Sequence, residues 1–75
     1  MSDVYLTRSD EARNMARYYC MTVQPTLFGE WALVREWGRI GRSGQVRSVA
    51  FADRAQADRA MVELKTVKER RGYHR

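Results

Sequence analysis

The sequence predicts an α+β domain in which a single antiparallel β-sheet of about four strands packs against one C-terminal helix. Before residue 53, short runs rich in aromatic and branched side chains, separated by turn residues, are typical of strands. From residue 53 onward the apolar side chains recur at helical spacing instead. A chain of 75 residues suits one core, so we expect one domain over residues 1–75.

Turn-forming residues separate the expected strands, which cover residues 4–8, 17–24, 31–37 and 45–51. A polar loop over residues 9–15 follows the first strand, which we expect at a sheet edge. Pro25 and Gly29 interrupt the chain after the second, and residues 41–44 form a hairpin turn. Alternation in the second strand places on one face Tyr19, Met21 and Val23, and on the other Tyr18, Cys20 and Thr22.

One helix is expected over residues 54–71. Asp53 is a favoured N-cap residue, and Gln56 three residues later completes a capping-box arrangement. An apolar stripe follows at helical spacing, formed by Ala57, Ala60, Met61, Leu64 and Val67. Gly72 ends the helix, because glycine readily adopts the left-handed conformation that often terminates helices. Only a face of the sheet can cover the stripe, so we expect two layers.

The chain is strongly basic, with 14 Lys and Arg against 9 Asp and Glu, a net charge of +5 and an isoelectric point near 10.0. This excess favours a polyanionic partner. One basic cluster accompanies the third and fourth strands and comprises Arg35, Arg39, Arg42 and Arg47. The other comprises Lys65, Lys68, Arg70, Arg71 and Arg75. For the second cluster, compensation of the helix macrodipole and solubility are an alternative role.

The chemically reactive residues do not favour an enzyme or a metal site. His74, the sole histidine, is penultimate, where we expect the chain to fray, and Cys20 is expected to be a small core residue. One cysteine and one histidine cannot complete a zinc site. A chain this short leaves little room for a deep substrate cavity. We therefore expect no catalytic residue, metal, cofactor or small-molecule substrate.

The expected location is the cytoplasm. A single cysteine excludes an internal disulfide and favours a reducing compartment. The N-terminal residues lack the apolar core of a signal peptide. The longest apolar runs, such as residues 31–34, are too short to span a membrane, so we expect no membrane partner.

Residues 36–45, with the sequence EWGRIGRSGQ, combine glycines with charged and aromatic side chains. Gly38 beside Trp37 lets the backbone approach a flat or polar group. Arg39 and Arg42 add planar, permanently charged side chains. This combination suits the end of a sugar-phosphate chain better than an enzyme pocket.

The order Trp37-Gly38-Arg39 in this context resembles the core of WGR domains, which occur in DNA-break-activated poly(ADP-ribose) polymerases and in small bacterial proteins. Upstream, the pattern of this family is reproduced by Leu6, Asp10, Asn14, Arg17, Tyr18 and Tyr19. Downstream, it is reproduced by Gly41-Arg42-Ser43-Gly44-Gln45 and by Gly72-Tyr73. The resemblance covers nearly the whole chain, and the free-standing architecture leads us to expect a bacterial protein.

The resemblance implies that Trp37 stacks on the sugar at a broken DNA end and that Arg39 contacts nucleic acid. In the polymerases the matching arginine also docks against neighbouring domains, a role for which Arg39 would need another polypeptide as partner. Residue type alone leaves other roles open. By residue type alone Trp37 is better suited to packing, whereas its place at a strand end beside Gly38 and several arginines favours exposure. Arg39 could instead form a surface ion pair with Glu36 or Asp10. Asn14 is a further backbone contact by its place in the pattern, or else a loop-capping asparagine.

We therefore expect a non-catalytic nucleic-acid-binding module that recognises DNA ends or breaks. Arginine contacts to phosphate hold a duplex in register without reading its sequence. The candidate binding residues are Trp37, Gly38, Arg39, Arg42, Arg35, Asn14, Arg47 and Lys68, with Lys65 and Arg71 extending the positive surface. The alternative is a protein-interaction module that docks a partner protein through the Trp37-Gly38-Arg39 surface.

Overall fold

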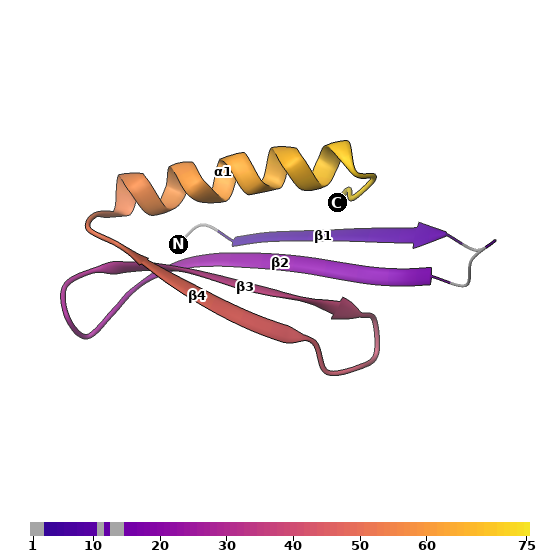
Figure 1. The fold of residues 1–75 in the computed structure, drawn as a ribbon, viewed down its shortest axis with the longest axis horizontal. Coiled ribbons are helices and arrows are strands. Elements are labelled where there is room, and N and C mark those ends of the chain that lie inside the picture. The colour runs from indigo at the N-terminus through magenta and orange to yellow at the C-terminus, as the bar shows by residue number, and fades with distance from the viewer. Residues whose placement is uncertain (1–2, 11, 13–14) are drawn as a thin grey trace.

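The strands and the helix follow one another in the predicted order. The computed structural model describes residues 3–10, 12 and 15–75. Its elements are β1 (Asp3–Asp10), β2 (Met15–Pro25), β3 (Trp31–Arg39), β4 (Gln45–Phe51) and α1 (Arg54–Arg70). The strands form one antiparallel sheet in the order β1-β2-β3-β4, and α1 lies over one face of it (Figure 1). The predicted α+β class, with one sheet and one C-terminal helix, is confirmed.

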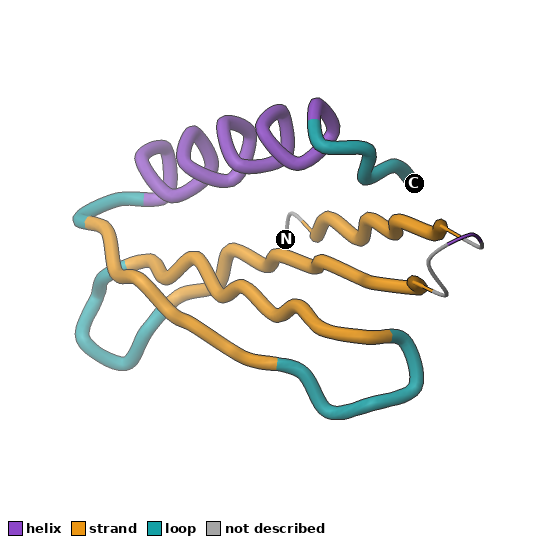
Figure 2. The backbone as a smooth tube through the Cα atoms, turned by 45° about the vertical axis from the view of Figure 1, so that its right-hand side comes forward, coloured by secondary structure: helices purple, strands orange, loops and turns teal. Residues whose placement is uncertain are grey.

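The core lies between α1 and the face of the sheet that α1 covers, which we call the covered face. Its buried side chains are Val4, Leu6, Tyr19, Met21, Val23 and Leu33 from the strands, and Ala57 and Met61 from α1. Around them pack the partly buried side chains of Trp31, Trp37, Phe51, Ala60, Leu64 and Tyr73. Within the described residues no helix covers the opposite face, which we call the open face (Figure 2).

One position of the predicted apolar stripe is wrong. Val67 is 40% exposed, whereas Lys68 turns toward the sheet and places its Nζ 4.6 Å from the ring centre of Tyr19. A row that continues from Ala57 and Met61 in helical steps of three and four reaches residue 68. A lysine can occupy such a place because its aliphatic stem lies along apolar surface while its charge remains near water.

The strands extend beyond the predicted limits, since β1 reaches Asp10, β2 begins at Met15 and β3 reaches Arg39. Backbone pairing does not require apolar side chains, and it continues through a row of arginines. Arg8, Arg17 and Arg39 lie in register across β1, β2 and β3. The connection between β1 and β2 is therefore shorter than the predicted loop over residues 9–15.

Both ends of α1 carry the expected capping residues. The Asp53 Oδ1 atom accepts a hydrogen bond from the Gln56 backbone N–H at 2.9 Å, which satisfies one of the free donors at the helix N-terminus. The helix ends at Arg70, one residue before the predicted limit, and Gly72 has a φ of 99°, in the left-handed region. No helix of the described residues combines the length and apolar character that a membrane crossing requires.

The C-terminal residues pair with the sheet, so the expected fraying at His74 is wrong. His74 exchanges two backbone hydrogen bonds with Thr7 of β1, at 2.7 and 2.9 Å. Tyr73 packs edge-on against Tyr19, with ring centres 6.2 Å apart. The left-handed conformation of Gly72 turns the chain back toward β1, and the tail then covers part of the outer edge of that strand.

Cys20 is half-buried on the open face, so the prediction that it lies in the core is wrong. Its neighbours in β2, Tyr19 and Met21, fill the core from the other face. Burial, followed by the nearby Glu36 carboxylate, raises the pKa of the Cys20 thiol. The protonated, unreactive form of this cysteine is therefore favoured.

Candidate nucleic-acid interface

The two faces of the sheet differ in charge. Among the described strand residues, every arginine lies on the covered face, and these are Arg8, Arg17, Arg35, Arg39 and Arg47. Asp3 and Glu36 lie on the open face, while Asp10 is on the covered face. The period of two along each strand produces this division, because the arginines are in phase with core residues such as Tyr19.

The strand arginines form two rows across the sheet. The first row consists of Arg8, Arg17 and Arg39, and the second places Arg35 directly opposite Arg47. Like charges directly opposite one another on neighbouring strands are destabilising. A negatively charged ligand relieves that repulsion, so these rows favour an anionic partner.

An aromatic cluster of Tyr19, Trp37 and Tyr73 lies beside these rows on the covered face. Tyr19 stacks on Trp37, with ring centres 6.0 Å apart and an angle of 22° between the planes. The guanidinium carbon of Arg35 lies 5.7 Å from the centre of the Trp37 ring. Arg35 also donates a hydrogen bond of 3.3 Å to the Tyr19 hydroxyl. The basic rows and the aromatic cluster are therefore in direct contact.

Trp37 itself is half-buried and has features of both predicted roles. Its ring packs against the core through Tyr19, as a packing residue does. On its other side, its partner in the β3–β4 pairing is Gln45, an exposed residue. Trp37 thus has a fixed orientation together with partial exposure, which are the two properties that a stacking platform needs.

Lys68 brings a further cation to the aromatic cluster from α1. Its Nζ lies 4.6 Å from the ring centre of Tyr19 and 5.8 Å from that of Tyr73. Burial lowers the pKa of Lys68 from its ordinary value, and the positive charges of Arg71 and Arg35 lower it further. Among the described residues, no carboxylate forms an ion pair with Lys68 or Arg35. No described carboxylate therefore neutralises the charges of Lys68 and Arg35.

Arg39 and Arg42 line a shallow hollow where β3 turns toward β4. The hollow has a volume of about 260 Å³ and is also lined by Ala16 and Ile40. The Arg42 N–H donates a hydrogen bond of 3.1 Å to the Arg39 carbonyl, and the Ile40 N–H donates one of 3.0 Å to the Ala16 carbonyl. These bonds fix the turn, so the two arginines flank a defined site at the end of the sheet.

Gly38 has a packing role that the sequence does not reveal. A Cβ atom at Gly38 would lie 2.8 Å from the Cα of Gly44, closer than such atoms can approach. A Cβ atom at Gly44 would collide with the Trp37 carbonyl oxygen and the Tyr18 hydroxyl. The two glycines therefore permit the hairpin to close. Gly38 belongs to the open face, away from the arginine rows.

Glu36 is not the ion-pair partner of Arg39, so that part of the predicted alternative is wrong. The two side chains project from opposite faces of β3. The Glu36 carboxylate instead accepts a hydrogen bond of 2.8 Å from the Tyr18 hydroxyl. This hydrogen bond raises the pKa of Tyr18.

The structure places most of the predicted binding residues together. Trp37 shares the covered face with Arg35, Arg39 and Arg47, Lys68 reaches toward that face from α1, and Arg42 lies in the turn after β3. Asn14 lies outside the described residues. Arg8 and Arg17 were missed as binding residues. Their phase with Leu6 and Tyr19 indicates the face on which they lie, but only the register of the strands places them beside Arg39.

The chemical groups on this surface are guanidinium and ammonium cations beside aromatic planes. Such groups bind phosphates and stack on nucleotides. Within the described residues, no three His, Cys, Asp or Glu side chains gather in a group that could hold a metal ion.

Comparison with known protein families places the chain in one of them, because the family described as WGR domain matches residues 2–75. The chain belongs to the WGR domain family. The predicted resemblance is confirmed. The WGR family is associated with nucleic-acid binding, and its domain is a binding module, not a catalytic one.

This WGR domain is similar to the uncharacterized protein y4dW of Sinorhizobium fredii (strain NBRC 101917 / NGR234). The two sequences are 46% identical over 70 residues, which cover 93% of this chain but 34% of y4dW. The chain thus spans 34% of the length of that relative. No solved structure matches the chain.

Proposed function

We propose that this WGR domain is a non-catalytic module that binds DNA at ends or breaks. The observation that supports this function is the position of five strand arginines on the same sheet face as a half-buried tryptophan. The arginines supply phosphate contacts, and Trp37 supplies a surface for a sugar. DNA is the nucleic acid that the family resemblance implies.

Phosphate binding is assigned to the two arginine rows and to Arg42. Neighbouring strands are about 4.8 Å apart, so a row of arginines across three strands spans about 10 Å. That span allows a row to meet more than one phosphate of the same DNA strand. If about three to five phosphates are contacted, the logarithm of the binding constant falls with that of salt concentration, with a slope of about −0.9 per contact.

Preference for an end or break is assigned to Trp37. Within a continuous strand the next nucleotide covers each sugar, whereas a nick or an end leaves one sugar accessible to an aromatic ring. Tyr19 holds the Trp37 ring in place. A sugar stacked on that ring brings its phosphate near Arg35, whose guanidinium carbon is 5.7 Å from the ring centre. Such contacts read no bases, so we expect no sequence preference.

Fluorescence anisotropy with three duplexes of identical sequence tests this function. One duplex is blunt, one carries a central nick, and one is closed by hairpin loops at both ends. We expect tighter binding to the nicked and blunt forms than to the closed form. Trp37→Leu should reduce that preference, whereas Arg17→Gln should weaken binding to all three forms alike. Arg59→Gln, which removes one charge from α1, is the matched control and should leave the preference unchanged.

Equal binding to the three duplexes by the wild-type domain would contradict recognition of ends or breaks. Folding of each variant is checked by circular dichroism, so that a loss of structure is not mistaken for a loss of contact.

Docking of a partner protein through Trp37 and Arg39, which share the covered face, is the second candidate function. It is favoured by the comparison with y4dW, in which the matched region is 34% of a longer protein. If the folded domain binds none of the three duplexes at low salt, this second function replaces the first.

A further inference from the structure

The two edges of the sheet are protected to different degrees. β1 carries three charged residues, Asp3, Arg8 and Asp10, and the tail pairs with its outer side at Thr7. β4 carries one, Arg47, within the sequence QVRSVAF. Among the described residues nothing pairs with the outer side of β4, which lies at the free edge of the sheet (Figure 2).

An edge strand presents a row of unpaired backbone N–H and C=O groups, which is a template for pairing with another strand. Proteins usually block such edges with several charges, a proline, a bulge or a covering segment. β4 has no proline, and every one of its residues except Phe51 is exposed. Val46 is 64% exposed and Val49 is 41% exposed. The outer edge of β4 is thus unpaired within the described residues and partly apolar.

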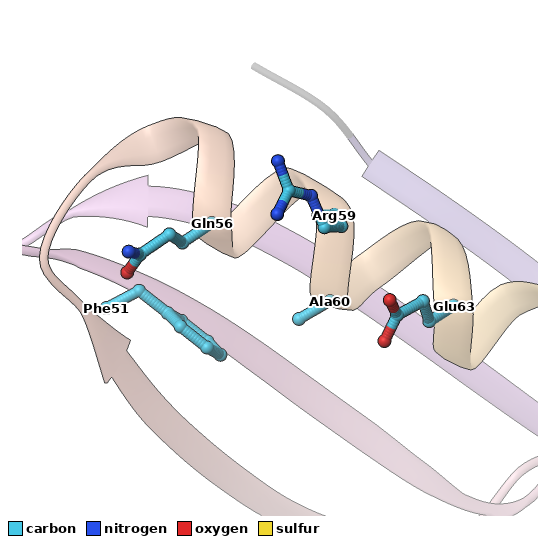
Figure 3. Close-up of a pocket in the computed structure, with 5 residues that line it drawn as sticks. All are labelled: Phe51, Gln56, Arg59, Ala60 and Glu63. Atoms are coloured by element: carbon cyan, nitrogen blue, oxygen red, sulfur yellow. The ribbon is translucent and has the colours of Figure 1, made fainter.

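A shallow groove lies between β4 and α1. It has a volume of about 290 Å³ and is lined by Phe51, Gln56, Arg59, Ala60 and Glu63. Figure 3 shows the Phe51 ring on the sheet side and Ala60 on the helix side of this groove, with the Glu63 carboxylate farther along α1. Among the described residues Glu63 has no ion-pair partner. A strand added beside β4 would find apolar surface here, together with one cation, Arg59, and one carboxylate, Glu63.

We propose that β4 is a pairing edge and that its occupant is β4 of a second copy of this chain. The two strands run antiparallel about a two-fold axis at Ser48, the middle residue of Gln45–Phe51. This register pairs Val46 with Ala50 and Arg47 with Val49 of the second copy. An axis at Arg47 would instead place two guanidinium groups directly opposite each other, which is destabilising.

The strand sequence is self-complementary in this register, as an isologous interface requires. Val46 and Ala50 cover each other on the open face. On the covered face, Arg47 of the second copy lies opposite Val49, on the side of the sheet where Glu63 is available. In this register no like charges face each other across the paired strands, and the apolar residues Val46 and Ala50 meet, which supports a second copy as the occupant.

The pairing keeps both helices on the same side of one continuous sheet, because the two-fold axis is perpendicular to the sheet. The arginine rows of the two copies then lie on the same side. This inference does not depend on nucleic-acid binding, and the association is measured without nucleic acid. Failure of one proposal is thus distinguishable from failure of the other.

A charge-swap experiment at Ser48 tests the pairing. Sedimentation velocity should show the wild-type chain, of 8.8 kDa, shifting toward twice that mass as its concentration rises. Ser48→Lys and Ser48→Glu should each remain monomeric, because like charges then face each other across the axis. An equimolar mixture of the two variants should recover the dimer. Ser9→Lys places the same charge on the open face of β1 and should dimerise as the wild type does.

Amide hydrogen exchange of the wild-type chain provides a measurement that needs no variant. Protection of the outward-facing β4 amides should increase with protein concentration, while that of the β1 amides should not. A wild-type chain that stays monomeric at all concentrations overturns the proposal. The strand that pairs with β4 would then have to come from another protein. Undiminished dimerisation of Ser48→Lys also overturns it.

Discussion

Arg35 of β3 and Arg47 of β4 lie directly opposite each other on the covered face of the sheet. Neither has a carboxylate ion-pair partner among the described residues. A pair of like charges in this position lowers the stability of the sheet. The same pair favours the binding of phosphate, because the two positive charges attract it. Stability and binding should therefore respond in opposite directions when one of these charges is removed.

Arg47→Gln should increase the free energy of unfolding by about 0.2–1 kcal/mol, because it removes a repulsive cross-strand pair. The same change should weaken DNA binding and reduce the salt slope by about 0.9, the contribution of one phosphate contact. Urea unfolding and binding titrations at several salt concentrations measure the two effects. A variant that loses stability and keeps its salt slope would contradict the assignment of Arg47 to phosphate binding.

Gly44→Ala should destabilise the domain by about 1–3 kcal/mol, the usual cost of inserting a methyl group where there is no space. The added Cβ would collide with the Trp37 carbonyl oxygen, a backbone atom that cannot move without distorting β3. Ser43→Ala in the same turn is the control and should change stability by less than about 0.5 kcal/mol. Thermal unfolding compares the two variants, and equal stabilities would show that the hairpin has more room than the structure indicates.

Lys68→Met should reveal the cost of holding a charged lysine in the aromatic cluster. Burial, together with Arg71 and Arg35, lowers the pKa of Lys68 below its ordinary value of 10.5. Between the lowered pKa and 10.5 the unfolded chain binds more protons than the folded domain, so stability rises with pH in that window. The free energy of unfolding of the wild type should thus rise relative to that of the variant across the window, and level off above it.

Urea unfolding of the two proteins at a series of pH values measures this difference. Taking the difference removes the titrations that the two proteins share. A difference that stays constant with pH, or that falls as pH rises, would contradict the lowered pKa.

Asp53→Ala should cost about 1 kcal/mol of stability, because it removes the side chain that caps α1. The carboxylate accepts its hydrogen bond from the Gln56 N–H at 2.9 Å. Asp53→Asn retains an oxygen acceptor and should be close to the wild type. Chemical unfolding of both variants checks the assignment, and equal losses for Ala and Asn would attribute the effect to charge instead of capping.

The fold class and the element order were predictable because local patterns determine them. Strand alternation, the turn residues and the Asp53 cap each depend on neighbours along the chain. The phase of the helix depends instead on how it packs against the sheet, and this placed Lys68 where Val67 was expected. The packing role of Gly38 likewise arises from its contact with Gly44 across the hairpin.

The candidate site was predictable only where local sequence patterns determine it. Residue types and the family resemblance identified Trp37 and the arginines of β3 and β4. They did not identify Arg8 and Arg17, which join Arg39 only through the register of three strands. Register depends on the length of the connections and on the covered apolar face, so the arginine rows became visible only in the assembled sheet.

Contact between Trp37 and the sugar at a DNA end or break is tested most directly by the fluorescence of this one ring. Trp31→Phe leaves Trp37 as the single tryptophan without altering the proposed contact. Titration at low salt with a nicked duplex should quench and shift its emission, while a duplex closed by hairpin loops at both ends should change it much less. Identical emission changes with the two duplexes, or none with either while binding occurs, would contradict the account.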